Sequence, residues 1–223
     1  TGAAGGIGKE LVTLLQSMPN VRITAFTRDK RTFDNRFGFL SNIYVSQFDF
    51  LMFNDKQLKK SMEHLDKIDI LINNAGYLIN KPFTEIVPID IHKMVQVNLT
   101  ATMLFTQACI PYLKKSDKAH IINISSMGGF QGSLKFPGLS VYSATKAAIC
   151  AFTEAIAEEY KSDKIHCNAI ALGATDTSMF NTAFPNQKAE RSPNEVAAFI
   201  ADFALNRRNL FNGKIIPLSA TTP

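Results

Sequence analysis

A tyrosine and a lysine four residues apart are the first feature of this sequence that could perform chemistry. Tyr142 and Lys146 lie in the segment YSATK, and residues at positions i and i+4 of a helix share one face. A free phenol has a pKa of about 10, but a neighbouring ammonium favours the phenolate and lowers that pKa. Tyr142 could then give a proton to a carbonyl oxygen or take one from an alcohol. The same spacing is common on amphipathic surface helices. The pair alone therefore does not identify a catalytic site, and other motifs in the chain must point to the same chemistry.

A glycine-rich turn, TGAAGGIG, is the second such feature. Gly2, Gly6 and Gly8 allow the backbone to turn sharply and to approach a pyrophosphate with no Cβ in the way. A helix starting near Ile7 would point its free amides at the phosphates. The alternative is a tight turn that binds nothing.

Apolar periodicity predicts the elements that position these residues. Helices are expected within 7–18, 28–41, 54–67, 88–115, 141–161 and 192–205, and strands within 21–27, 42–50, 67–72, 120–125, 164–172 and 213–218. Pro111 is expected to kink its helix, and Ser192 with Glu195 forms a capping box. This alternation predicts one α/β domain over residues 1–223, a doubly wound, Rossmann-type parallel sheet with helices on both faces.

The alternation also predicts a strand before Thr1, because a phosphate-binding turn normally follows a buried strand. We therefore expect that several residues of an apolar strand precede this sequence in the natural chain. A chain that truly began at Thr1 should be poorly stable and bind a cofactor weakly, because the first strand's hydrogen bonds and apolar faces would be lost.

Composition narrows the classes of protein. The 223 residues are 46% hydrophobic and 19% charged, with a net charge of +5, which is typical of a globular protein with a sizeable core. We expect no membrane segment, no nucleic-acid partner and a cytoplasmic location. Three widely spaced cysteines and four scattered histidines predict neither a disulfide framework nor a metal site.

Four stretches in order, TGAAGGIG, DILINNAG, IINISSMGG and YSATK, resemble the short-chain dehydrogenase/reductase family in its compact, non-extended form. The resemblance covers nearly the whole chain. It implies that Tyr142 is the general acid/base, that Lys146 lowers its pKa and that Ser126 binds the reacting oxygen. Ser125 is the alternative serine, although the family motif favours the second of the pair. Asn98 resembles the asparagine that belongs to the family's proton relay.

The resemblance also implies a set of cofactor contacts. Asp49 resembles the residue that binds the adenine amino group, and the stretch 168–177 resembles the segment around the nicotinamide. The expected contacts are Gly2, Gly6, Ile7, Gly8, Arg28, Asp49, Asn74, Ala75, Gly76, Thr175 and Thr177.

The end of the expected strand 21–27 predicts which nicotinamide cofactor binds. An acidic residue there would select NAD through the ribose 2′-hydroxyl, but Thr27 is neutral and Arg28 suits a 2′-phosphate. We therefore expect NADP(H), with NAD(H) as the alternative if Asp29 is the selecting carboxylate. Gly5 stands where many NADP-using relatives carry a basic residue, which weakens the case for NADP(H).

The resulting expectation is an NADPH-dependent reductase of a small or medium ketone or aldehyde, working in either direction as a homodimer or homotetramer. A longer interval than usual, 142 − 126 = 16 residues, separates Ser126 from Tyr142 and predicts a larger loop over the substrate pocket. The alternatives are an idle NADP-binding sensor or scaffold and a lyase or epimerase that retains its cofactor. The expected apolar pocket comprises Phe130, Leu134, Phe136, Met179, Phe180 and Phe184, and the alternative for these residues is plain core packing.

Overall fold

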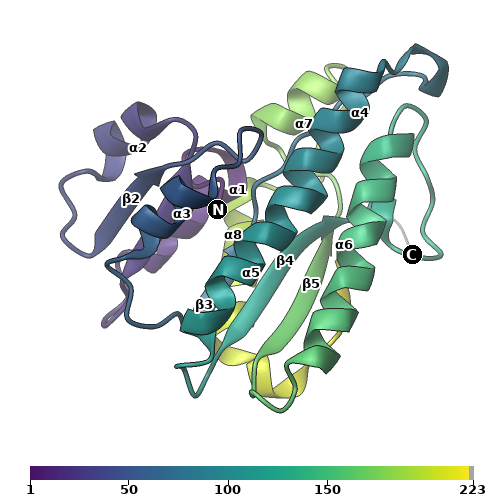
Figure 1. The fold of residues 1–223 in the computed structure, drawn as a ribbon. Helices are drawn as coiled ribbons and strands as arrows, with labels where there is room; N and C mark the ends of the chain where they lie inside the picture. Colours follow the sequence, from purple (N-terminus) through teal and green to yellow (C-terminus); the bar gives the residue numbers. More distant parts are fainter. Residues whose placement is uncertain (221–223) are drawn as a thin grey trace.

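The computed structural model describes residues 1–220, so residues 221–223 of the predicted domain lie outside the described part. Its strands are all parallel and are flanked by helices, which confirms the predicted α/β class (Figure 1). The strands are β1 (Ile23–Thr27), β2 (Ile43–Gln47), β3 (Ile70–Asn73), β4 (His120–Ser126), β5 (His166–Leu172) and β6 (Ile215–Leu218). The α-helices are α1 (Gly6–Leu15), α2 (Lys30–Phe37), α3 (Asp55–Met62), α4 (Pro88–Val95), α5 (Ala101–Leu113), α6 (Ser140–Glu159), α7 (Ser178–Ala183) and α8 (Pro193–Asn206).

The hydrogen-bonded strands form two groups, β1–β2 and β3–β4–β5–β6. The residues of the glycine-rich turn lie between these groups. The Thr1 amino group donates to the Ile72 carbonyl at 2.8 Å, and the Ala3 amide donates to the Phe26 carbonyl at 3.2 Å. The turn is therefore attached to the carboxyl-terminal ends of both β1 and β3, the edge where ligands bind in open parallel α/β folds.

Two apolar cores lie on opposite faces of the larger sheet because successive strand residues point to opposite sides. Ile121 of β4 packs with α5 and α6, whereas Ile122 packs with α1 and α8. Figure 1 shows α5 and α6 in front of β4 and β5, with α8 behind them. Both faces are covered, as the near-continuous apolar strands predict.

The predicted helix 88–115 is instead two helices joined by a π-helical turn over Gln96–Thr100. Pro111 lies inside α5, near its end. The predicted capping box is confirmed, since Ser192 and Glu195 bond reciprocally at the start of α8. Helix α7 was not predicted, because its six residues bury no side chain and so carry no periodic signal. Within residues 1–220, no helix is both long and apolar enough to cross a membrane.

A buried histidine should make the stability of the fold depend on pH. The Nδ1 atom of His120 donates to the Ala204 carbonyl at 3.1 Å, and its Nε2 accepts from the Asn168 amide at 3.0 Å, so the ring is held neutral. Burial lowers the pKa of His120 from 6.5 to about 4. The unfolded chain therefore binds a proton that the folded chain excludes, and stability falls as pH drops from about 6.5 towards 4.

We expect this one group to cost on the order of 3 kcal/mol of unfolding free energy across that interval. Urea unfolding of wild type and His120→Gln at several pH values checks the expectation, with the exposed His92→Gln as control. The pH dependence should flatten only in the His120 variant. If the unfolding free energy of His120→Gln depended on pH as strongly as that of wild type, groups other than His120 would cause the loss of stability in acid.

Candidate functional site

Tyr142, Lys146 and Ser126 come together where α6 crosses the end of β4. The Lys146 ammonium lies 5.7 Å from the centroid of the Tyr142 ring. It also donates to the Ile124 carbonyl at 2.8 Å, which holds it against the strand. The Ser126 side chain lies close enough to the Tyr142 hydroxyl to favour its phenolate. The structure thus joins the three side chains that the sequence predicted as a catalytic group.

Burial dominates the pKa of Tyr142. It raises this pKa to about 12, and the neighbouring Ser126 side chain opposes that rise only in part. Burial also lowers the pKa of Lys146 to about 8. Desolvation of the phenol therefore dominates the pKa of Tyr142 in the protein without a cofactor, and the lowering of that pKa by Lys146 stays a prediction.

The two neighbouring serines have different environments. Ser125 is buried and donates to the Lys146 carbonyl at 2.9 Å, so its hydroxyl fixes the backbone of α6. Ser126 accepts from the Gly128 amide at 3.2 Å and lies beside the Tyr142 hydroxyl, whose phenolate it favours. This arrangement favours Ser126 over Ser125 as the group beside the reacting oxygen.

Asn98 lies in the π-helical turn, the kind of helix irregularity that often marks functional sites. Its side chain accepts from the Tyr77 amide at 2.7 Å and donates to the Tyr77 carbonyl at 2.8 Å. It also donates to Thr145, one residue before Lys146, at 3.1 Å. A methyl group placed on Gly76 would lie 3.7 Å from both Asn98 Oδ1 and Lys146 Nζ. Asn98 therefore belongs to the surroundings of Lys146.

The glycine-rich turn is shaped to receive an anion. Gly2 and Gly6 have φ angles of +68° and +50°, which glycine adopts without strain. A Cβ on Gly8 would overlap the Gly2 carbonyl and lie 2.8 Å from the Asn74 amide nitrogen, whereas a Cβ on Gly5 would meet nothing within 4 Å. No side chain caps α1 and no acidic residue lies in its first turn, so its amides are open to a phosphate.

Two further predicted cofactor segments contact this turn. The amides of Asn74 and Ala75 donate to the Thr1 hydroxyl at 3.0 and 2.9 Å. From the other side, Thr177 caps α7, and its methyl group would lie 3.2 Å from a Cβ on Gly6. The structure thus gathers all three segments around the start of α1.

The other expected contacts lie at the same edge of the fold. Asp49 follows β2 and accepts from the Leu51 amide at 2.9 Å. The preceding Phe48 amide donates to the Thr27 carbonyl at 2.8 Å, which places this segment beside the end of β1. Thr175 follows β5 and is buried.

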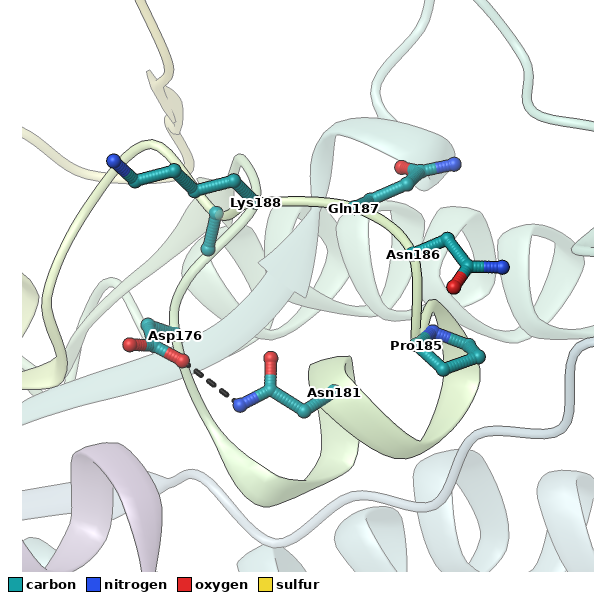
Figure 2. A pocket seen from close by; sticks show the side chains of 7 residues that line it. Asp176, Asn181, Pro185, Asn186, Gln187 and Lys188 are labelled. Atoms are coloured by element: carbon teal, nitrogen blue, oxygen red, sulfur yellow. Dashed lines mark hydrogen bonds between the residues drawn. The ribbon is translucent and has the colours of Figure 1, made fainter.

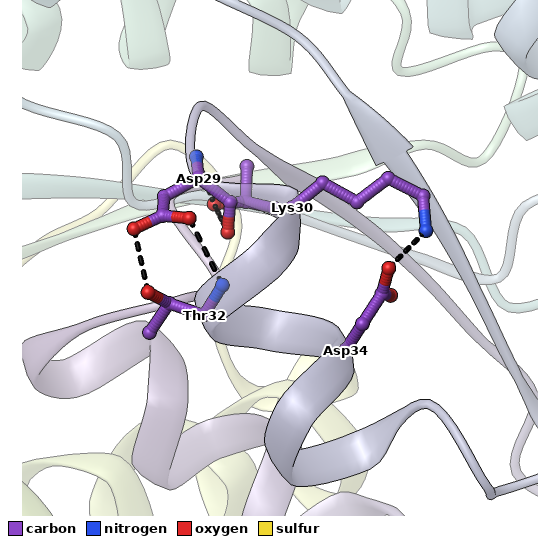
Figure 3. Close-up of polar contacts among 5 residues, drawn as sticks. Asp29, Lys30, Thr32 and Asp34 are labelled. Carbon is purple, nitrogen blue, oxygen red and sulfur yellow. Dashed lines mark hydrogen bonds and ion pairs between the residues drawn. The ribbon is translucent and has the colours of Figure 1, made fainter.

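The end of β1 is compatible with a 2′-phosphate. Thr27 is the last residue of β1, and Arg28 is exposed directly after it. The Asp29 carboxylate caps α2, accepting from the Thr32 amide at 2.9 Å and hydroxyl at 2.6 Å (Figure 3). Those hydrogen bonds hold the pKa of Asp29 below its ordinary value. With Asp29 hydrogen-bonded to Thr32, Arg28 is the exposed cationic side chain directly after the strand, and Arg31 lies close by.

The sequence placed Met179 in the expected apolar pocket but did not predict that it belongs to a helix, α7. The Met179 methyl would lie 3.9 Å from a Cβ on Gly76, the same position that approaches Asn98 and Lys146. Of the predicted apolar pocket, Phe180 and Phe184 pack together with ring centroids 5.2 Å apart. The signal that could have located α7 is Thr177, a good helix N-cap.

The segment after α7 encloses a polar cavity of about 390 Å³ (Figure 2). Asn181 donates to Asp176 across it at 2.9 Å. Its lining contains none of the predicted catalytic residues. Among residues 1–220, no group of three or more acidic, histidine or cysteine side chains is placed to hold a metal ion.

Comparison with known proteins gives consistent results. The family profile described as short chain dehydrogenase matches residues 1–188. The 3-oxoacyl-[acyl-carrier-protein] reductase FabG of Aquifex aeolicus is 29% identical over 238 residues, covering 97% of this chain and 92% of that protein. The structure of ElxO with NADP bound has a TM-score of 0.83 at 23% identity, covering 97% of this chain and 94% of that one. A 3-ketoacyl-(acyl-carrier-protein) reductase from Brucella melitensis complexed with NADH has a TM-score of 0.82 at 22% identity, with 97% and 93% covered.

Proposed function

The chain belongs to the short-chain dehydrogenase family, and from this premise we propose that it is an oxidoreductase that uses NADP(H) to interconvert a small or medium ketone or aldehyde and its alcohol. The observation that carries this proposal is the shared environment of Tyr142, Ser126 and Lys146 at the end of β4. This group lies on the same edge of the fold as the open glycine-rich turn.

The proposed chemistry follows from the positions of these side chains. Ser126 donates a hydrogen bond to the carbonyl oxygen and orients it towards Tyr142. The Tyr142 hydroxyl gives its proton to that oxygen during reduction and recovers one through the surroundings of Lys146 and Asn98. A phenol with a pKa of about 12 is fully protonated at neutral pH and so is ready to act as the acid.

The residues present fit a dinucleotide. Gly2, Gly6, Ile7 and Gly8 would hold the pyrophosphate at the uncapped start of α1. Asn74, Ala75 and Gly76 would lie along the adenosine ribose, Asp49 at the adenine, and Thr175 and Thr177 at the nicotinamide end. When bound, the cofactor supplies or accepts the hydride, and its oxidised ring adds a positive charge that favours the phenolate.

The direct test is NADPH oxidation with a panel of ketones and aldehydes, preceded by fluorescence titration with NADPH and NADH. Tight NADPH binding with consumption of cofactor by at least one carbonyl supports the proposal. Cofactor binding with no turnover across the panel would favour an idle sensor or a lyase that retains its cofactor. Sedimentation of the same sample checks the expected homodimer or homotetramer.

Cofactor preference should depend on Arg28. We expect Arg28→Ala to weaken NADPH binding by about tenfold or more, because a charge-assisted hydrogen bond to the 2′-phosphate is lost. NADH binding should change little. Arg22→Ala is the matched control, since Arg22 is exposed at the opposite end of the same strand. Equal losses for both cofactors would remove Arg28 as the selecting residue.

A further inference from the structure

A second cavity, of about 380 Å³, opens beside the start of α6. Residues 135–138 form one wall, Phe83 forms another, and Ser140 and Ser143 of α6 also line it. Residues 135–138 belong to a loop over residues 130–139, which lies in the long interval between Ser126 and Tyr142. We call this loop the Ser–Tyr loop. The cavity is therefore built from the part of the chain that the sequence predicted to cover a substrate.

The cavity adjoins the catalytic group. Ser143 directly follows Tyr142, and its Oγ is enclosed with no hydrogen-bond partner in the structure. A Cβ on Gly128 would lie 2.8 Å from Ser143 Oγ and 3.6 Å from Ser126 Oγ. Gly128 therefore lies close to both hydroxyls, although none of Tyr142, Ser126 and Lys146 belongs to the cavity lining.

The walls are held in place by contacts between distant segments. The Lys81 amide donates to the Gly138 carbonyl at 3.1 Å. Asn80 packs against Gly138, where any side chain would collide with it, and donates to the Ala183 carbonyl at the end of α7 at 2.8 Å. The loop containing Phe83, the Ser–Tyr loop and α7 are therefore joined, and the cavity is formed before any ligand arrives.

The lining favours a neutral, apolar group. The Lys135 ammonium donates to the Phe130 carbonyl at 2.6 Å and to the Ser133 hydroxyl at 2.9 Å, so its charge stabilises the loop. Phe83 and Phe136 are 67% and 44% exposed, and a ligand would remove that apolar surface from water. An anionic group would lose its hydration, and the ammonium of Lys135, the one cationic residue of the lining, is already hydrogen-bonded to the loop.

We propose that this cavity binds an apolar substituent of the carbonyl substrate, with Phe83 and Phe136 as residues that determine specificity. The inference rests on the proposed oxidoreductase function and adds the class of substrate, an aryl or alkyl ketone. A cavity of about 150 Å³ can hold benzene, so this one has room for a phenyl ring with a short linker.

Three methyl ketones that differ only beyond the carbonyl test the proposal: 2-butanone, 4-phenyl-2-butanone and 4-oxopentanoate. With NADPH, wild type should reduce 4-phenyl-2-butanone with the highest kcat/KM. Phe136→Ala and Phe83→Ala should each lower that value by about tenfold while 2-butanone changes less than about threefold. Phe39→Ala removes another exposed phenylalanine, outside the cavity lining, and should leave both values unchanged.

A preference for 4-oxopentanoate, or a phenyl preference that survives both cavity variants, would overturn the proposal while leaving the oxidoreductase function intact. Loss of self-association in these variants with unchanged ketone preference would also overturn it, because a second copy would then cover the cavity. If no ketone is reduced, the proposed function fails, and calorimetric titration with 4-phenyl-2-butanone decides the subsite separately. Weaker binding to Phe136→Ala than to wild type supports the subsite, and equal binding rejects it.

Discussion

Tyr142→Phe is expected to lower kcat for carbonyl reduction by about 10²- to 10⁴-fold, because it deletes the hydroxyl that transfers the proton. The ring that packs beside the Lys146 ammonium remains, so the fold and the NADPH affinity should be retained. Steady-state kinetics and fluorescence titration on the same preparation separate the two effects. Loss of turnover with retained affinity is the expected result.

Tyr160→Phe is the matched control because Tyr160 is the residue that ends the same helix, away from the catalytic group. It should leave kcat and NADPH affinity unchanged. Full turnover by Tyr142→Phe would assign proton transfer to another group and would remove the central step of the proposed mechanism. Loss of NADPH binding in that variant would show that Tyr142 helps to hold the cofactor.

Features that depend on local spacing were predictable from sequence. The Tyr142–Lys146 pair follows from one helical turn, and the glycine-rich turn follows from positions that need a missing Cβ. Parallel strands were readable because apolar residues follow one another with few polar interruptions. The lengths of elements were less predictable, since the π-helical turn at Gln96–Thr100 has no distinct apolar period.

Features that depend on contacts between distant segments were not predictable. The pairing of Asn98 with the Tyr77 backbone, and of Asn80 with α7, joins residues far apart in sequence. The pKa of Tyr142 in the protein without a cofactor was not predictable either, because burial, which sequence does not report, dominates it. The different surroundings of Ser125 and Ser126 were not predictable in detail, although successive strand residues must face opposite sides.

The glycine-rich turn leads to the second large expected effect. Gly8→Ala should weaken NADPH binding by about 100-fold or more, because the turn that places α1 amides at the phosphates would have to open. The added methyl would overlap the Gly2 carbonyl and lie 2.8 Å from the Asn74 amide nitrogen. Such overpacking should also cost about 1–3 kcal/mol of unfolding free energy.

Gly5→Ala is the matched control in the same turn. Gly5 has a φ of −145°, which any residue adopts, and a Cβ there would meet nothing within 4 Å. Its NADPH affinity should stay within about threefold of wild type, a change of less than about 0.7 kcal/mol. Circular dichroism establishes that both variants are folded before titration. If Gly8→Ala bound NADPH as tightly as Gly5→Ala, close approach of the backbone at Gly8 would not be required, and the pyrophosphate would have to lie elsewhere than at the start of α1.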